Sequence, residues 1–202
     1  MSSKVNNIIR QFIEEDVIEA PKTNNTMTFW HGGNLSDYDD TIAHKKGRYE
    51  FGAGLYLTTS FEVVQKYRKG SRKLYMITVR KGTDIRDASL DYDECLSFIN
   101  EFVITTKRKE IILAVSSRNN NGRVPASIFN NIVLNYEGIK PSSTPALREF
   151  LINNGIDYQM VGNAFGWGEE MMVLYNMKMI ENVVQVKPGD KVISYDLPTE
   201  WN

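Results

Sequence analysis

Three segments of the sequence contain side chains whose types and spacing could do chemistry together. In chain order they are Phe29-Trp-His-Gly-Gly33, Phe51–Tyr67 and Gly168–Asn176. The first contains His31, the second contains Tyr56 and Tyr67 eleven residues apart, and the third opens with Glu169 and Glu170. Flat aromatic faces bind a cationic ring by stacking and cation–π attraction, an imidazole hydrogen-bonds hydroxyl groups, and a carboxylate stabilises developing positive charge. Stacking, hydrogen bonding and stabilisation of positive charge are therefore the chemistry that these segments could provide together.

The common site templates are absent from the sequence. The one Gly-x-Gly, Gly52-Ala-Gly54, precedes a predicted strand instead of following one, so it does not fit the dinucleotide-binding fingerprint of doubly wound folds. There is no P-loop motif, no Gly-x-Ser-x-Gly, no His-Glu-x-x-His and no Cys-x-x-Cys. Cys95 lies among apolar residues at helical spacing, which is typical of a buried structural thiol and not of a nucleophile.

Composition predicts one soluble domain over residues 1–202. The chain has 42% hydrophobic and 24% charged residues and a net charge of -1, which is ordinary for a globular protein. A single cysteine excludes a disulfide scaffold, and one cysteine with two histidines leaves too few ligands for structural zinc, so we expect no metal. We find no transmembrane or signal-peptide pattern, and a near-zero charge argues against bulk binding to nucleic acid or membrane. We expect a cytoplasmic protein.

The elements that must position the three segments are grouped by type, which favours an α+β domain over alternating βαβ units. Predicted strands cover residues 27–31, 55–59, 74–79, 156–161, 171–175, 183–186 and 192–195. Predicted helices cover residues 1–20, 60–67, 93–116 with a break near Thr105, 127–136 and 144–155. The strands thus fall into two groups, and a helical insertion over residues 93–140 separates them.

The three segments together resemble the ADP-ribosyltransferase superfamily, in its His-Tyr-Glu branch, which includes diphtheria toxin and the poly(ADP-ribose) polymerases. In that branch a strand ends in His-Gly, a Gly-x-Gly-hydrophobic-Tyr strand feeds a helix with a second Tyr, and a Glu opens a late apolar strand. The order and the tyrosine spacing match here, over about 80 to 90 of the 202 residues. The resemblance implies two packed, mainly antiparallel β-sheets around an NAD+ cleft, with helices around them.

The resemblance also implies roles for individual residues. Tyr56 and Tyr67 would hold the nicotinamide ring of NAD+ between them, and His31 would hydrogen-bond a ribose hydroxyl. The backbone of Gly32 would bind the carboxamide, and Gly54 would line the same cofactor site. Catalysis would fall to His31, Tyr56 and the late glutamate, with NAD+ as co-substrate and no metal.

Either of two adjacent carboxylates can be the late glutamate. Glu169 and Glu170 point to opposite faces of an extended strand, so one of them can face the cleft. We choose Glu170 because a run of apolar residues follows it, as in the family. Aligning Tyr175-Asn176 with the end of the family strand shifts the glutamate position onto Met171, and a one-residue bulge would restore Glu170 to it.

The implied function is transfer of a single ADP-ribose from NAD+ to a macromolecular acceptor, most simply a host protein, with release of nicotinamide. The size of the chain resembles that of small bacterial toxins and phage-encoded host modifiers, which act in the host cytoplasm. Two alternatives stay open. One is a nucleic-acid ADP-ribosyltransferase or a tRNA 2′-phosphotransferase-like enzyme; the other is a catalytically inactive module that binds NAD+ or ADP-ribose.

Overall fold

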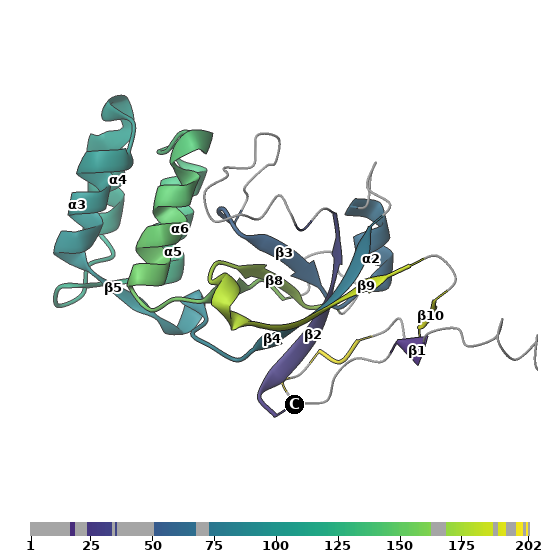
Figure 1. Cartoon of the computed structure of the whole chain (residues 1–202). Coiled ribbons are helices and arrows are strands. Elements are labelled where there is room, and N and C mark those ends of the chain that lie inside the picture. The colour runs from purple at the N-terminus through teal and green to yellow at the C-terminus, as the bar shows by residue number, and fades with distance from the viewer. Residues whose placement is uncertain are drawn as a thin grey trace, which may run out of the picture.

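A computed structural model provides the structure of the chain (Figure 1). It describes residues 17–18, 24–33, 35, 51–67, 73–162, 169–187, 190–192, 197–199 and 201. Most of the predicted N-terminal helix and the loop between residues 36 and 50 lie outside these described residues, as does the glycine-rich segment 163–168.

The centre of the fold is a six-stranded antiparallel sheet. Its order is β7 (Tyr158–Met160), β8 (Met171–Leu174), β3 (Leu55–Thr58), β2 (Thr26–Gly32), β4 (Leu74–Arg80) and β9 (Ile180–Val186). The β2–β4 ladder runs over seven residue pairs, whereas β2 and β3 pair in the described part of the chain only at Trp30 and Thr58. The sheet therefore consists of two three-stranded halves joined at one point.

Different helices cover one face of the two halves. The half formed by β2, β4 and β9 packs against α2 (Phe61–Tyr67), where the rings of Trp30 and Phe61 meet edge to face at 5.3 Å between centroids. Ser60 caps this helix as expected, because its hydroxyl accepts a hydrogen bond from the Val63 amide at 3.3 Å. The half formed by β7, β8 and β3 packs its Val173 side chain against the other helices.

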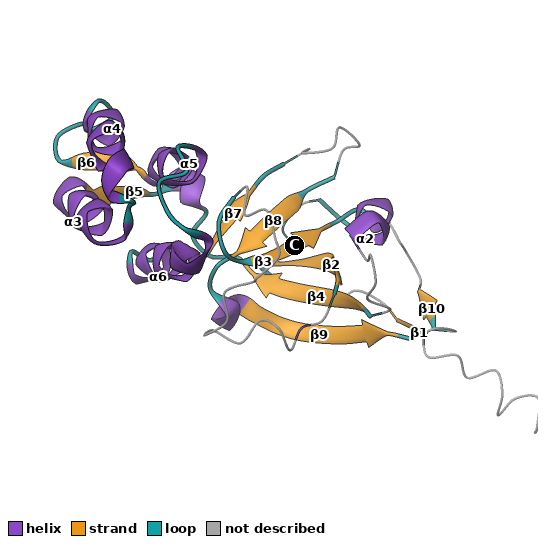
Figure 2. Ribbon diagram, turned by 90° about the horizontal axis from the view of Figure 1, so that it is seen from above, coloured by secondary structure: helices purple, strands orange, loops and turns teal. Residues whose placement is uncertain are grey.

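Those other helices form a separate group beyond β7, which we call the helical lobe (Figure 2). It contains α3 (Tyr92–Phe102), α4 (Thr105–Ser116), α5 (Ala126–Asn135) and α6 (Thr144–Asn153), with the two-stranded sheet β5 (Ser89–Asp91) and β6 (Arg123–Pro125). Aromatic rings of Phe98, Phe129 and Phe150 contact one another in its core. Short 3-10 turns at Ile85–Asp87, Pro141–Ser143 and Met177–Met179 connect the elements.

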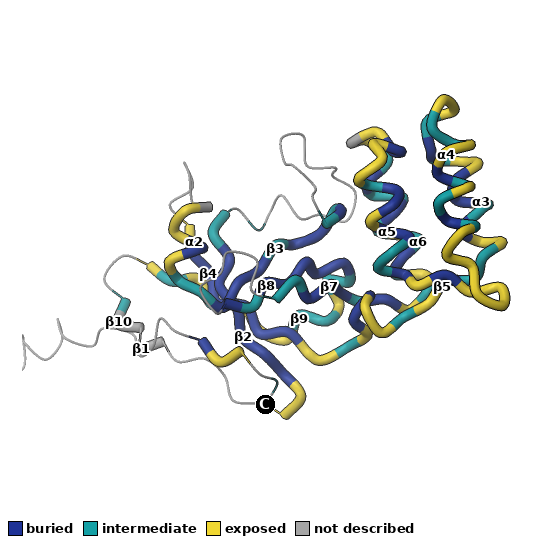
Figure 3. Tube along the Cα trace, turned by 180° about the vertical axis from the view of Figure 1, so that it is seen from behind, coloured by how far each residue is buried: buried dark blue, intermediate teal, exposed yellow. Residues whose placement is uncertain are grey.

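The opposite face of the sheet carries its own apolar cluster, and the central strands are buried along most of their length (Figure 3). The cluster includes Phe29, Leu57, Tyr75, Met160 and Met172, one from each of five strands. Because β-strand side chains alternate between faces, these residues mark which face each neighbouring side chain takes.

Most predicted elements are confirmed, together with the α+β class and the mainly antiparallel pairing. Where two packed sheets were predicted, these strands form two joined halves of one six-stranded sheet. The predicted N-terminal helix is wrong at Val17–Ile18, which form strand β1 and pair in parallel with β10 (Lys191–Val192). This pairing joins residues far apart in sequence, so local periodicity could not reveal it. The three-residue strands β5 and β6 were not predicted.

Candidate functional site

His31 lies near the end of β2, where the β2–β3 ladder has ended. Its Nδ1 is 3.0 Å from the carbonyl oxygen of Tyr56. Since a carbonyl oxygen only accepts hydrogen bonds, Nδ1 must carry a proton, which leaves Nε2 as the acceptor in the neutral ring. The imidazole also stacks on Tyr75, the residue opposite it in β4, with ring centroids 6.4 Å apart and planes 28° apart. The side chain is 5% exposed and its orientation is fixed from two sides.

The two glycines after His31 allow the backbone to pack closely beside its imidazole. The Gly33 amide donates to the Lys73 carbonyl at 3.3 Å, so the backbone of Gly33 points toward β4. The backbone of Gly32 therefore points the other way, toward β3, beyond the last β2–β3 pair. A Cβ at Gly33 would lie 2.9 Å from Nε2 of His31, closer than real Cβ atoms approach, so a side chain there would displace the imidazole.

Tyr56 meets His31 through its backbone, and its ring takes the other face of the sheet. Because Trp30 pairs with Thr58, Tyr56 shares a face with Trp30, whereas His31 shares its face with Tyr75. The Tyr56 ring packs against the core of the helical lobe, and its hydroxyl donates to the Gly52 carbonyl at 2.9 Å. This geometry gives Tyr56 a part in holding the turn that precedes β3. Its stacking on nicotinamide stays a prediction.

Of the other two predicted cofactor-binding residues, Tyr67 and Gly54, the structure describes the surroundings only of Gly54. Tyr67 is the last residue of α2, and its side chain lies outside the described part of the structure. At Gly54 a Cβ would lie 2.7 Å from both the Leu174 carbonyl oxygen and Cγ1 of Val173. Glycine at this position thus permits the close approach of the chain to β8. Its contact with a cofactor stays a prediction.

The predicted bulge in β8 is wrong. β3 and β8 stay in one continuous register from Leu55–Leu174 to Thr58–Met171. The pairing continues beyond β8, where the Thr59 amide donates to the Glu170 carbonyl at 2.9 Å and the Glu170 amide donates to Oγ1 of Thr59 at 2.9 Å. The threonine hydroxyl takes the place of the backbone carbonyl that would extend the ladder, so the strand ends without an inserted residue.

The two adjacent glutamates occupy different environments. Strand alternation from Met172 places Glu170 on the face that also carries His31 and Tyr75, and places Glu169 on the other. Glu169 is 3% exposed, whereas Glu170 is only partly buried. The carboxylate on the His31 face is thus the more accessible of the two. This geometry favours the choice of Glu170 over Glu169.

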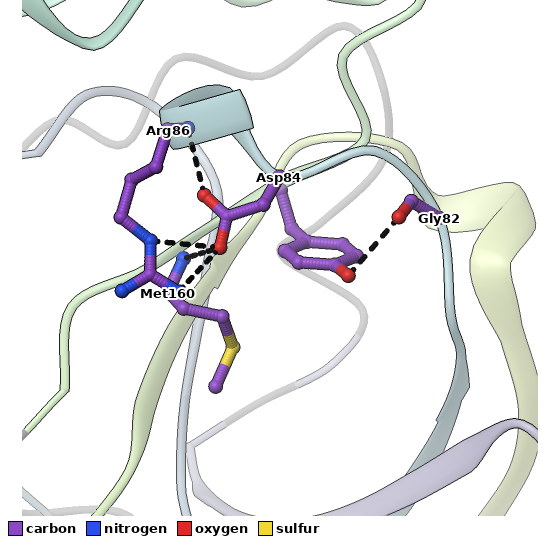
Figure 4. A network of polar contacts seen from close by, with 5 residues as sticks. Gly82, Asp84, Arg86 and Met160 are labelled. Atoms are coloured by element: carbon purple, nitrogen blue, oxygen red, sulfur yellow. Dashed lines mark hydrogen bonds and ion pairs between the residues drawn. The ribbon is translucent and has the colours of Figure 1, made fainter. Parts of the chain in front are cut away.

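Sequence reasoning missed a charged pair, Asp84 and Arg86, which lies beside the last residue of β7. Asp84, which is buried, accepts at Oδ2 from Nε and Nη2 of Arg86 at 3.0 and 2.7 Å (Figure 4). The Met160 amide donates to the same oxygen at 3.3 Å, and the Arg86 amide donates to Oδ1 at 2.9 Å. The guanidinium is thereby fixed beside β7. The only sequence signal is the Asp-x-Arg spacing after a strand, which is too short to be specific.

This pair influences the charge of Glu170. Burial raises the pKa of the Glu170 carboxyl, the Arg86 guanidinium opposes that rise, and the charges of Glu169 and Asp84 add to it. Hydrogen bonding to Asp84 raises the pKa of Arg86 in turn, so Arg86 remains a cation. Arg86 therefore favours the ionised form of the Glu170 carboxylate and opposes the effect of its burial.

Comparisons with known proteins do not identify a family for this chain. A scan against protein-family models and searches of curated proteins and of solved structures each gave no match. Within the described residues there is no cluster of three or more His, Cys, Asp or Glu side chains arranged to hold a metal ion. No helix in the described part of the chain combines the length and the apolar character of a membrane span. Cys95 is buried as expected, and burial raises the pKa of its thiol to about 12.

Proposed function

We propose that this protein transfers a single ADP-ribose from NAD+ to a macromolecular acceptor, most simply a host protein, and releases nicotinamide. One observation carries the proposal. The segments with the His-Gly, Gly-x-Gly-Leu-Tyr and glutamate motifs, up to 140 residues apart in sequence, are neighbours in the sheet in the order β8–β3–β2. His31 and Glu170 share one face of that sheet, at the point where its two halves diverge.

The backbone beside His31 is suited to the carboxamide of NAD+. A carboxamide needs one hydrogen-bond donor and one acceptor at close range. The N–H and C=O of Gly32 point past the last β2–β3 pair, and no Cβ restricts the approach. His31, with its proton held on Nδ1 by the Tyr56 carbonyl, presents Nε2 as an acceptor for a ribose hydroxyl.

Glu170 would supply the charge that the reaction needs. Loss of nicotinamide from NAD+ leaves an oxocarbenium-like sugar, and an ionised carboxylate nearby lowers the energy of that cation. Arg86 helps to keep Glu170 ionised despite its partial burial. Tyr56 contributes by holding the Phe51–Gly54 turn, and its stacking on nicotinamide together with Tyr67 is carried over from the family.

The missing bulge supports a second candidate function. Without it, the position that the family gives to its glutamate belongs to Met171, which pairs directly with Thr58. A thioether cannot stabilise a cation as a carboxylate does. An inactive module that binds NAD+ or ADP-ribose would have the same sheet and the same His-Gly segment without needing Glu170.

Label transfer from adenylate-labelled NAD+ to a cell lysate tests the proposal, with released nicotinamide counted in parallel. We expect label on macromolecules with the wild type, and a loss of about 100- to 1000-fold with Glu170→Gln. Glu169→Gln, which changes the buried neighbour, is the matched control and should keep most of the activity. Equal losses in both variants would contradict the role of Glu170.

The same experiment separates the two candidates. Calorimetric binding of NAD+ by a folded protein that releases no nicotinamide would contradict the transferase and support the binding module. Nicotinamide release without label on macromolecules would contradict transfer to a lysate acceptor and indicate NAD+ hydrolysis in the same site.

A further inference from the structure

A buried polar cluster joins the helical lobe to the turn before β3. Asn130 of α5 is fully buried, and its Nδ2 is 3.4 Å from the Phe51 carbonyl oxygen and 3.3 Å from Oε1 of Gln159. The hydroxyl of Tyr175, which follows β8, lies 3.0 Å from the same two oxygens. One backbone carbonyl of the turn is thus held by side chains from two distant segments.

Asn130 is a costly residue for the position that it occupies. Its Oδ1 is buried and has no hydrogen-bond partner among the described residues. Its neighbours along α5, Phe129 and Val133, are buried apolar side chains. A buried amide with one unsatisfied atom destabilises a fold relative to an apolar residue of the same size. Stability alone therefore does not account for an asparagine at this position. Its hydrogen bond to the Phe51 carbonyl does account for it, because an apolar residue could not make that bond.

The turn itself depends on such contacts. Gly52 has a φ of +97°, a conformation that most residues avoid, so the backbone has little intrinsic preference for this shape. Tyr56 holds the turn from within, because its hydroxyl donates to the Gly52 carbonyl at 2.9 Å and accepts from the Phe51 amide at 3.4 Å. Asn130 and Tyr175 hold the Phe51 carbonyl from outside.

We propose that Asn130 is a positioning residue, through which the helical lobe fixes the Phe51–Gly54 turn beside β3. The lobe then helps to position the backbone of the proposed site, in addition to packing against the sheet. That Asn130 thereby improves the binding of NAD+ rests on the proposed function. The positioning of the turn does not, because it concerns only contacts within the chain.

Amide hydrogen exchange on the full chain tests the positioning directly. In Asn130→Leu we expect the amides of Phe51 to Gly54 to exchange about fivefold faster relative to those of β4, as the loss of one hydrogen bond implies. Tyr175→Phe keeps the ring and removes the hydroxyl, and we expect it to act in the same direction. This second variant decides the question if Asn130→Leu does not fold.

Val133→Ala is the matched control, since it opens a cavity in the same helix one turn away and removes no hydrogen bond to the Phe51 carbonyl. It should speed exchange within α5 and leave the turn unchanged relative to β4. Unchanged exchange at the turn in both polar variants, or an equal effect of Val133→Ala, would overturn the proposal.

Kinetics with NAD+ distinguishes positioning from general weakening of the fold. If the wild type releases nicotinamide, Asn130→Leu should raise KM for NAD+ about fivefold and leave kcat nearly unchanged. A fall in kcat at unchanged KM would contradict the link to NAD+ binding. If the wild type releases none, the proposed function fails, and the exchange result still decides whether Asn130 positions the turn.

Discussion

The sheet and the helical lobe bury different kinds of residue. Nine polar or charged side chains are buried in the sheet strands and the segments that flank them: Thr26, Thr28, His31, Thr58, Thr59, Thr78, Asp84, Gln159 and Glu169. The lobe buries only Asn130 and Thr144 among its described residues. Burying a polar group is unfavourable unless it is paired, so the sheet must provide hydrogen-bond partners for many more buried groups than the lobe.

This difference separates a scaffold from a site. The lobe has a continuous apolar core with contacting phenylalanine rings, and its one thiol is inert because burial raises the pKa of Cys95 to about 12. In the sheet, the His31 imidazole and the carboxylates of Glu169 and Glu170 lie near Trp30–Thr58, the one β2–β3 pair among the described residues. We infer that the lobe contributes mainly stability and reaches the proposed site through Asn130, whereas most of the buried polar side chains lie in the sheet.

The largest effect should come from the core of the lobe. Phe129→Ala removes a fully buried ring that contacts Phe98 and Phe150. We expect it to lower the free energy of unfolding by about 3–5 kcal/mol in chemical denaturation. Leu113→Ala, at a side chain that is 63% exposed, is the control and should change it by less than about 0.5 kcal/mol. A loss below about 1 kcal/mol for Phe129→Ala would show that the lobe does not stabilise the protein.

A smaller effect should distinguish glycines of the two regions. Gly54→Ala in the sheet places a Cβ 2.7 Å from the Leu174 carbonyl oxygen, and because that neighbour is backbone the strands must shift, at about 3 kcal/mol. Gly122→Ala in the lobe meets no atom within 4 Å, so only its φ of +78° is at issue, at about 1 kcal/mol. Thermal unfolding of both variants checks the difference. Equal losses would mean that the Cβ added at Gly54 is accommodated without the expected shift of β3 against β8.

Local signals predicted most elements and failed where long-range pairing decides. Apolar spacing and the Ser60 cap sufficed for β2, β3, β4 and the helices, because those patterns act within a few residues. The faces taken by His31 and Tyr56 depend instead on a register fixed by the Trp30–Thr58 pair, which no local pattern encodes. For the same reason the contact of Asp84 with Met160, 76 residues away at the end of β7, could not be predicted.

The smallest effect should appear at Glu170 as a dependence of stability on pH. The folded state raises the pKa of this carboxyl above its unfolded value of about 4.3, mainly by burial. The folded state therefore binds the proton more tightly, and the stability that this contributes is full below about pH 4 and is lost as pH rises through the folded pKa. Glu170→Gln should thus equal the wild type at low pH and exceed it at pH 7 by a few tenths of a kcal/mol, since solvent screening limits the effect.

Arg86 provides the test of that explanation. Its guanidinium opposes the rise in the pKa of Glu170, so Arg86→Met should raise that pKa further. In the Arg86→Met background, the gain in stability from Glu170→Gln at pH 7 should therefore be larger than in the wild type. Denaturation of the four proteins at pH 4 and pH 7 measures this coupling. A smaller gain in that background would mean that Arg86 does not favour the ionised carboxylate, and the sheet would then lack the charge compensation that sets its site apart from the lobe.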